Sequence, residues 1–119
     1  MDAQHHHESA GGLVISDEVI AAIAVTAAKE IEGVSSIVPR TDVTRFLRLA
    51  EHLRLVKVYG GEAEVALQLS VRMQAGARLA AVAGELQAKM KEAVQNMTGR
   101  TVSRVNITVV GADLPHHQN

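Results

Sequence analysis

The spacing of apolar residues along the chain predicts two long helices. The first begins after Ser16, which suits an N-cap, with Asp17 and Glu18 at the positive end of the helix dipole. Its predicted buried face is half alanine, which implies a close approach to the layer beneath, and comprises Ile20, Ile23, Ala24, Ala27, Ala28 and Ile31. Gly33 is predicted to terminate this helix in a left-handed conformation.

The second predicted helix lies between Gly76 and Gly99. Its apolar stripe repeats every three or four residues and comprises Leu79, Val82, Ala83, Leu86, Met90, Ala93, Val94 and Met97. A third, shorter helix is predicted within residues 41–53, with a loop as the alternative. The residues at helical spacing there are Val43, Phe46, Leu47, Ala50 and Leu53.

Alternation of apolar and polar residues predicts the strands. A hairpin is expected to run from Leu55 to Met73 around a turn at Gly60 and Gly61, with a short strand at 34–38 and a last strand at 102–110. The alternation leaves one face of the sheet polar, as in an antiparallel sheet covered by helices on one side. The predicted fold class is therefore α+β, a two-layer sandwich in which a small, mainly antiparallel sheet carries two long helices and the short third helix on one face.

Composition supports a single domain at residues 11–112 between polar, disordered tails at 1–10 and 113–119. The 119 residues are 47% hydrophobic with a net charge of −1, so there is no global attraction to nucleic acid or anionic lipid. The absence of cysteine excludes disulfides and Cys-ligated zinc. The longest apolar run, of about ten residues, is half the length of a membrane span, and no secretory signal is visible. These features predict a cytoplasmic protein.

The sequence offers little catalytic chemistry. Asp17 and Glu18 are explained by their place at a helix start, and no nucleophile-elbow or phosphate-binding motif is present. Adjacent histidines on the tails (His5, His6, His7, His116 and His117) could bind a metal, but flexible tails lack the fixed geometry of a functional site. No enzyme activity, cofactor or metal is therefore predicted.

A local group of basic residues is the strongest candidate for a binding site. It comprises Arg40, Arg45, Arg48, Arg54 and Lys57, interrupted by Asp42 and Glu51. One interpretation is a solvated helix face; the other is a contact for anionic lipid head groups, nucleic-acid phosphates or an acidic protein. Nucleic acid is the less favoured ligand because the chain lacks a GxxG loop and aromatic stacking platforms.

Three stretches together resemble the alkaline shock protein family, also called the Gls-type general stress or envelope stress response family. They are residues 12–20 running on to 31–34, the strand at 65–71, and Asn96-Met97-Thr98-Gly99 leading to Val105-Asn106-Ile107. The resemblance covers about residues 11–111. It implies a bacterial cytoplasmic protein linked to alkaline or envelope stress, with no catalytic residues to carry over. It also implies higher assemblies and attachment to the membrane through a membrane-anchored partner, as in some members.

The sequence departs from the family pattern at Ala75-Gly76 and in the arginine-rich segment 40–54. The leading hypothesis is a non-enzymatic envelope-stress scaffold that self-associates or docks on a membrane-anchored protein partner, peripheral to the membrane. The alternative is a nucleic-acid or anionic-lipid binding module that uses the basic residues between 40 and 57.

Overall fold

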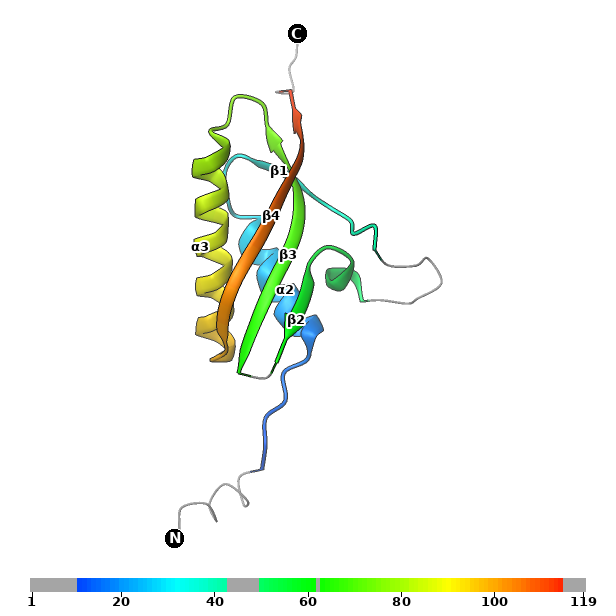
Figure 1. Ribbon diagram of the computed structural model, residues 1–119, viewed down its shortest axis with the longest axis vertical. Coiled ribbons are helices and arrows are strands. Elements are labelled where there is room, and N and C mark those ends of the chain that lie inside the picture. The colour runs from blue at the N-terminus through cyan, green and yellow to red at the C-terminus, as the bar shows by residue number, and fades with distance from the viewer. Residues whose placement is uncertain (1–10, 43–49, 62, 115–119) are drawn as a thin grey trace.

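A computed structural model describes residues 11–42, 50–61 and 63–114 of the chain, and Figure 1 shows their arrangement. Its elements in order are α2 (Asp17–Ala28), β1 (Val34–Val38), the 3-10 helix η1 (Glu51–Arg54), β2 (Lys57–Gly60), β3 (Glu64–Gln74), α3 (Leu79–Thr98) and β4 (Thr101–Asp113). The predicted α+β class, with two long helices on one side of a small sheet, is confirmed.

Strand β3 is the centre of the sheet. Strand β4 runs parallel to it along its whole length, from Glu64 opposite Thr101 to Gln74 opposite Asp113. The opposite edge of β3 is shared by β2 and β1, which pair antiparallel with its first and second halves. A parallel neighbour needs a crossover connection, and α3 supplies it between β3 and β4.

The predicted hairpin turn is confirmed at Gly60 and Gly61. The Gly61 amide donates to the Glu64 carbonyl at 2.9 Å. Gly60 has a φ of +116°, and a Cβ there would lie 2.7 Å from the Glu64 carbonyl oxygen. The turn therefore requires glycine at position 60, both for its backbone conformation and for space.

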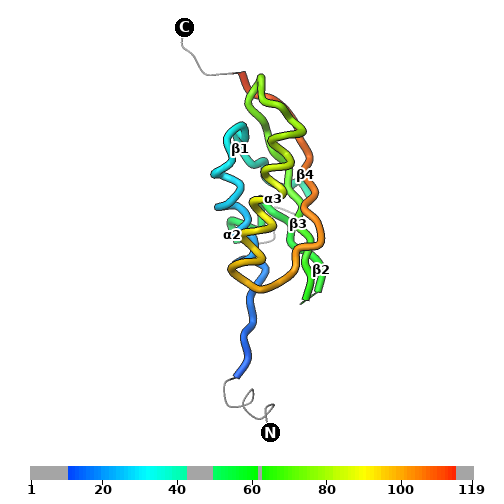
Figure 2. Tube along the Cα trace, turned by 90° about the vertical axis from the view of Figure 1, so that its left-hand side faces the viewer, coloured from blue at the N-terminus to red at the C-terminus, as the bar shows by residue number. Residues whose placement is uncertain are grey.

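Both helices cover the same face of the sheet, and Figures 1 and 2 show them running in opposite directions. The sheet side chains beneath them alternate as predicted: Val65, Leu67, Leu69, Val71 and Met73 are buried. They pack against the helices in one core, whose largest fully buried side chains are Ile20, Leu67, Met73, Leu86 and Met90. The opposite face of the sheet has no helix over it in the described part of the chain.

Helix α2 begins where the sequence predicts. The Ser16 hydroxyl accepts a hydrogen bond from the Val19 amide at 3.3 Å, which confirms the N-cap. The helix ends at Ala28, and Ile31 lies in the turns that follow. Ile23 is only half-buried, whereas Ala21 and Val25 are buried, so the buried face is turned relative to the prediction. Gly33 has the predicted positive φ, at the end of these turns.

Helix α3 ends at Gly99, as predicted; this residue has a left-handed conformation with φ of +77°. Its buried residues are Val82, Leu86, Met90 and Val94. Leu79 and Met97, at the two ends of the predicted apolar stripe, are not buried: these side chains are 47% and 70% exposed. Both point in the same direction as the buried stripe, but they lie in the first and last turns of the helix, where the described residues cover them only in part.

The middle of the chain is described only in part. Residues 43–49 lie outside the described residues, so the helix predicted within 41–53 is not tested there; η1 is a single 3-10 turn after them. Strand β2 begins at Lys57 rather than Leu55, because the amides of Leu55 and Val56 donate to the His52 carbonyl. Strand β4 continues to Asp113, one residue past the predicted domain end.

Candidate partner-binding surfaces

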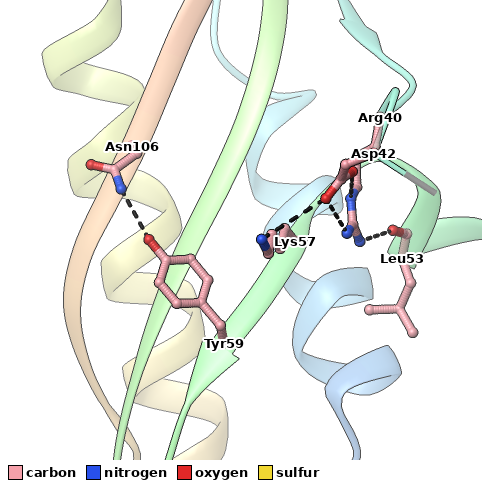
Figure 3. Close-up of polar contacts among 6 residues, drawn as sticks. All are labelled: Arg40, Asp42, Leu53, Lys57, Tyr59 and Asn106. Atoms are coloured by element: carbon pink, nitrogen blue, oxygen red, sulfur yellow. Dashed lines mark hydrogen bonds and ion pairs between the residues drawn. The ribbon is translucent and has the colours of Figure 1, made fainter.

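Arg40, one of the five predicted binding residues, is engaged in an internal contact. Its guanidinium donates through two nitrogens to the Asp42 carboxylate, each at 2.9 Å, and through Nη1 to the Leu53 carbonyl at 2.8 Å (Figure 3). Only 17% of its side chain is exposed. The hydrogen bond from Arg40 lowers the pKa of the Asp42 carboxyl below its ordinary value. Arg40 therefore ties the end of β1 to η1 across the segment between them.

Lys57 lies beside this contact and is more accessible. Its Nζ is 3.9 Å from an Asp42 oxygen and 5.6 Å from the centre of the Tyr59 ring, and 42% of its side chain is exposed. The Arg54 carbonyl accepts from the Arg40 amide at 2.7 Å. The structure thus brings Arg40, Arg54 and Lys57 together. Arg45 and Arg48 lie outside the described residues, so an anion site that needs all five stays a prediction.

The open face of the sheet is polar. The Asn106 amide of β4 donates to the Tyr59 hydroxyl of β2 at 3.0 Å, and the hydrogen bond passes over β3 (Figure 3). The register places further polar residues on this face, among them Gln68, Ser70, Arg104 and Thr108. Its charged residues include Lys57 and Arg104 but also Glu64 and Asp113, so the face presents no field of one sign to a charged ligand.

An ionic contact joins three strands at the other end of this face. Arg72 of β3 donates to Asp113 of β4 at 2.7 Å, and Ser35 of β1 donates to the other oxygen of the same carboxylate. Gly111 makes this possible, because a Cβ there would lie 2.5 Å from the Arg72 guanidinium. The hydrogen bonds from Arg72 and Ser35 lower the pKa of Asp113. The contact is structural, because it joins β1, β3 and β4.

An apolar groove lies on the outer side of the helix layer. It encloses about 390 Å³ between α2 and α3 and is lined by Ala22, Ile23, Thr26, Ala27, Glu30, Lys89, Ala93 and Met97. The ammonium of Lys89 is 3.3 Å from Glu30, so a salt bridge closes one end. Near the other end, Met97 is 70% exposed, and Val19 in the first turn of α2 is 48% exposed. An exposed apolar surface with a polar rim is typical of a protein contact.

The sequence pattern does not predict this groove, because Met97 belongs to the same apolar stripe as the buried residues of α3. The helix lengths explain the exposure of Met97: the twelve residues of α2 span about 18 Å and the twenty of α3 about 30 Å at 1.5 Å per residue. A helix that outruns its neighbour leaves apolar residues uncovered at an end. Met97 lies in the last turn of α3, two residues before the terminating Gly99, which is such an end.

The described residues contain no cluster of three or more His, Cys, Asp or Glu side chains that could hold a metal ion. The tail histidines lie outside the described ranges, so their metal binding is not tested. Within the same ranges, no helix has the length and apolar content needed to cross a membrane.

Comparison with known proteins identifies relatives of the chain and its family. The Bacillus subtilis protein YqhY, an uncharacterised protein, is 28% identical over 109 residues, which are 90% of this chain and 81% of that protein. A solved structure of a substituted MamM CTD matches with a TM-score of 0.51 at 11% identity, over 82% of this chain and 96% of that chain, and supports the fold alone. The model of the alkaline shock protein 23 family, described by a cell envelope-related function, matches residues 5–114. The chain therefore belongs to the alkaline shock protein 23 family, as the three resembling stretches predicted.

Proposed function

We propose that this protein is a non-enzymatic scaffold of the envelope stress response, which docks on a membrane-anchored protein partner and self-associates. The family description supports the link to the cell envelope. The observation that carries the docking function is the apolar groove between α2 and α3, with Met97 exposed beside it.

The shape and chemistry of the groove favour a protein segment as its occupant. Its floor is built from small side chains, Ala22, Ala27 and Ala93, which let a partner approach the backbones of both helices. Ile23 and Met97 supply larger apolar walls, and methionine adapts its shape to different partners. An amphipathic helix that lays its apolar side between α2 and α3 would use these features.

The test is affinity purification from the native cells in a gentle detergent, with mass spectrometry of the soluble and membrane fractions. Tagged wild-type protein is compared with Met97→Glu, which places a charge in the groove. Asn96→Glu is the matched control, because it adds the same charge to the same helix turn at a residue that does not line the groove. We expect a membrane protein to be retained by the wild type and by Asn96→Glu and lost with Met97→Glu.

Equal retention by Met97→Glu would contradict the groove as the docking surface, and the absence of any membrane protein with the wild type would contradict the docking function. The alternative, a nucleic-acid or anionic-lipid module, rests on the basic residues between 40 and 57. Binding of wild-type protein to nucleic acid or to anionic vesicles at low salt, lost on Lys57→Glu, would favour that alternative.

A further inference from the structure

The outer edge of β4 is open along half its length. The Gly61 amide of the turn donates to the Glu64 carbonyl, and main-chain direction alternates along a strand. Ala66 and Gln68 therefore direct their main-chain groups toward β2, and Leu67 and Leu69 direct theirs toward β4. The parallel register then turns the main chains of Arg104, Asn106 and Thr108 toward β3 and those of Val105, Ile107 and Val109 outward. No strand of the described residues pairs with this outer edge.

Two glutamines of α3 occupy the first half of this edge. The Gln95 side-chain oxygen accepts from the Val102 amide at 2.9 Å, and the Gln87 side-chain nitrogen donates to the Val105 carbonyl at 3.1 Å. Beyond Val105, no described residue outside β4 makes a hydrogen bond to the outward groups of Ile107 and Val109. The second half of the edge thus presents unpaired donors and acceptors.

This half also lacks the usual protection of an edge strand. Natural edges are blunted by charged side chains, proline or a covering element. The segment from Val105 to Ala112 contains no charged residue and no proline, and it is rich in β-branched residues. Val109 and Val110 are 36% and 49% exposed. Such an edge is suited to pair with another strand.

The neighbouring side of α3 leaves room for a second copy. Ala80 and Gly84 lie on the same side of α3 as Gln87, because they precede it by seven and three residues, and Gln87 reaches the β4 edge. A Cβ at Gly84 would meet no atom within 4 Å, so this side is open. Small residues there would let the α3 helices of two copies approach when their β4 edges meet.

We propose that two copies of this chain pair edge to edge through β4, antiparallel, with Thr108 opposite Thr108 of the second copy at the two-fold axis. Ile107 then exchanges main-chain hydrogen bonds with Val109 of the other copy. The bulge at Val110 shifts the residues beyond it by one position, which brings Arg104 of one copy opposite Asp113 of the other on the open face.

The charges at the ends of the strand favour this arrangement over a parallel one. Arg104 lies near the start of β4 and Asp113 at its end, so antiparallel pairing places opposite charges together twice. The inference rests on the self-association in the proposed function, but it uses the edge of β4 and not the α2–α3 groove, so either can fail without the other.

The register can be tested by cross-linking, because the chain has no cysteine of its own. We expect Thr108→Cys to form a disulfide-linked dimer under mild oxidation, since residues facing each other in an antiparallel pair lie within disulfide distance. Asn106→Cys is the control on the same strand and face. At the proposed register it lies about 13 Å from its counterpart, at 3.3 Å per residue, and should cross-link at least about tenfold more slowly.

A charge exchange tests the dimer without cysteine. Thr108→Glu and Thr108→Lys should each be monomeric in analytical ultracentrifugation, because like charges meet at the axis, whereas an equal mixture should form dimers. Thr108 is exposed, and circular dichroism with the unfolding midpoint checks that each variant is folded. A wild type that is monomeric at the highest attainable concentration, or equal cross-linking at positions 106 and 108, would overturn the proposal. Retention of the membrane partner by Thr108→Glu would show that docking survives without this dimer.

Discussion

The two helices cover the same sheet, but they use their residues differently. Helix α2 has twelve residues, of which six are buried. Four of its five alanines have 4% exposed surface or less, which allows the helix to lie close to the strands. Helix α3 has twenty residues, of which four are buried along one narrow stripe. Helix α2 is therefore part of the core, whereas α3 is buried along one stripe and its ends and sides are exposed for other contacts.

Truncation of the α3 stripe should have the largest effect on stability. Leu86 is fully buried, and Leu86→Ala should lower the free energy of unfolding by about 2–5 kcal/mol, because it removes apolar contacts and leaves a cavity. Leu79→Ala, seven residues earlier on the same side of the helix, is the control and should cost much less, because Leu79 is 47% exposed. Urea unfolding measures both. Similar losses would mean that the first turn of α3 is packed.

Enlargement of an alanine in α2 tests the close approach of that helix. Ala24 has no exposed surface, and Ala24→Leu should destabilise the fold by about 1–3 kcal/mol, because the extra atoms have no space. Thr26→Leu, on the exposed side of α2, is the control and should change stability by less than about 0.5 kcal/mol. If Ala24→Leu were tolerated as well as the control, α2 would not be packed closely against the sheet.

This contrast explains which parts of the fold the sequence could predict. The start of α2 at Ser16 and the end of α3 at Gly99 are set by local chemistry, and both predictions are confirmed. The alternation from Val65 to Met73 fixes the buried face of β3 by the geometry of a strand. The exposure of Leu79 and Met97 could not be predicted from periodicity, because periodicity gives the direction of a side chain and not the extent of what lies opposite.

The candidate surfaces depend on contacts between distant residues, so the sequence gives less information about them. The five basic residues were grouped by proximity along the chain, but the Arg40 guanidinium is already bonded to Asp42 and to the Leu53 carbonyl. The open half of the β4 edge arises because Gln87 and Gln95 reach one half of that strand and not the other. No local pattern distinguishes these glutamines from other exposed residues of α3.

Substitution of the N-cap residues of the two helices should change the free energy of unfolding by smaller amounts, in opposite directions. Ser16→Ala removes the acceptor for the Val19 amide and should cost about 1 kcal/mol. The N-cap of α3 is Arg78, whose backbone is extended but whose side chain makes no capping hydrogen bond. Arg78→Ser should therefore stabilise the fold by up to about 1 kcal/mol. Thermal unfolding of both variants measures the two shifts, and a loss for Arg78→Ser would indicate that Arg78 has another structural role.

Substitution at the end of α3 should have the smallest effect on stability. Met97→Gln should change the free energy of unfolding by less than about 0.5 kcal/mol, because the side chain is 70% exposed. Met90→Gln, seven residues earlier and fully buried, is the comparison; it should cost more than about 2 kcal/mol, because it buries an amide without partners. Urea unfolding gives both values. A large loss for Met97→Gln would place Met97 in the core. A negligible loss would mean that Met97 contributes little to folding stability. Any loss of partner binding on its substitution would then be due to the change in the groove.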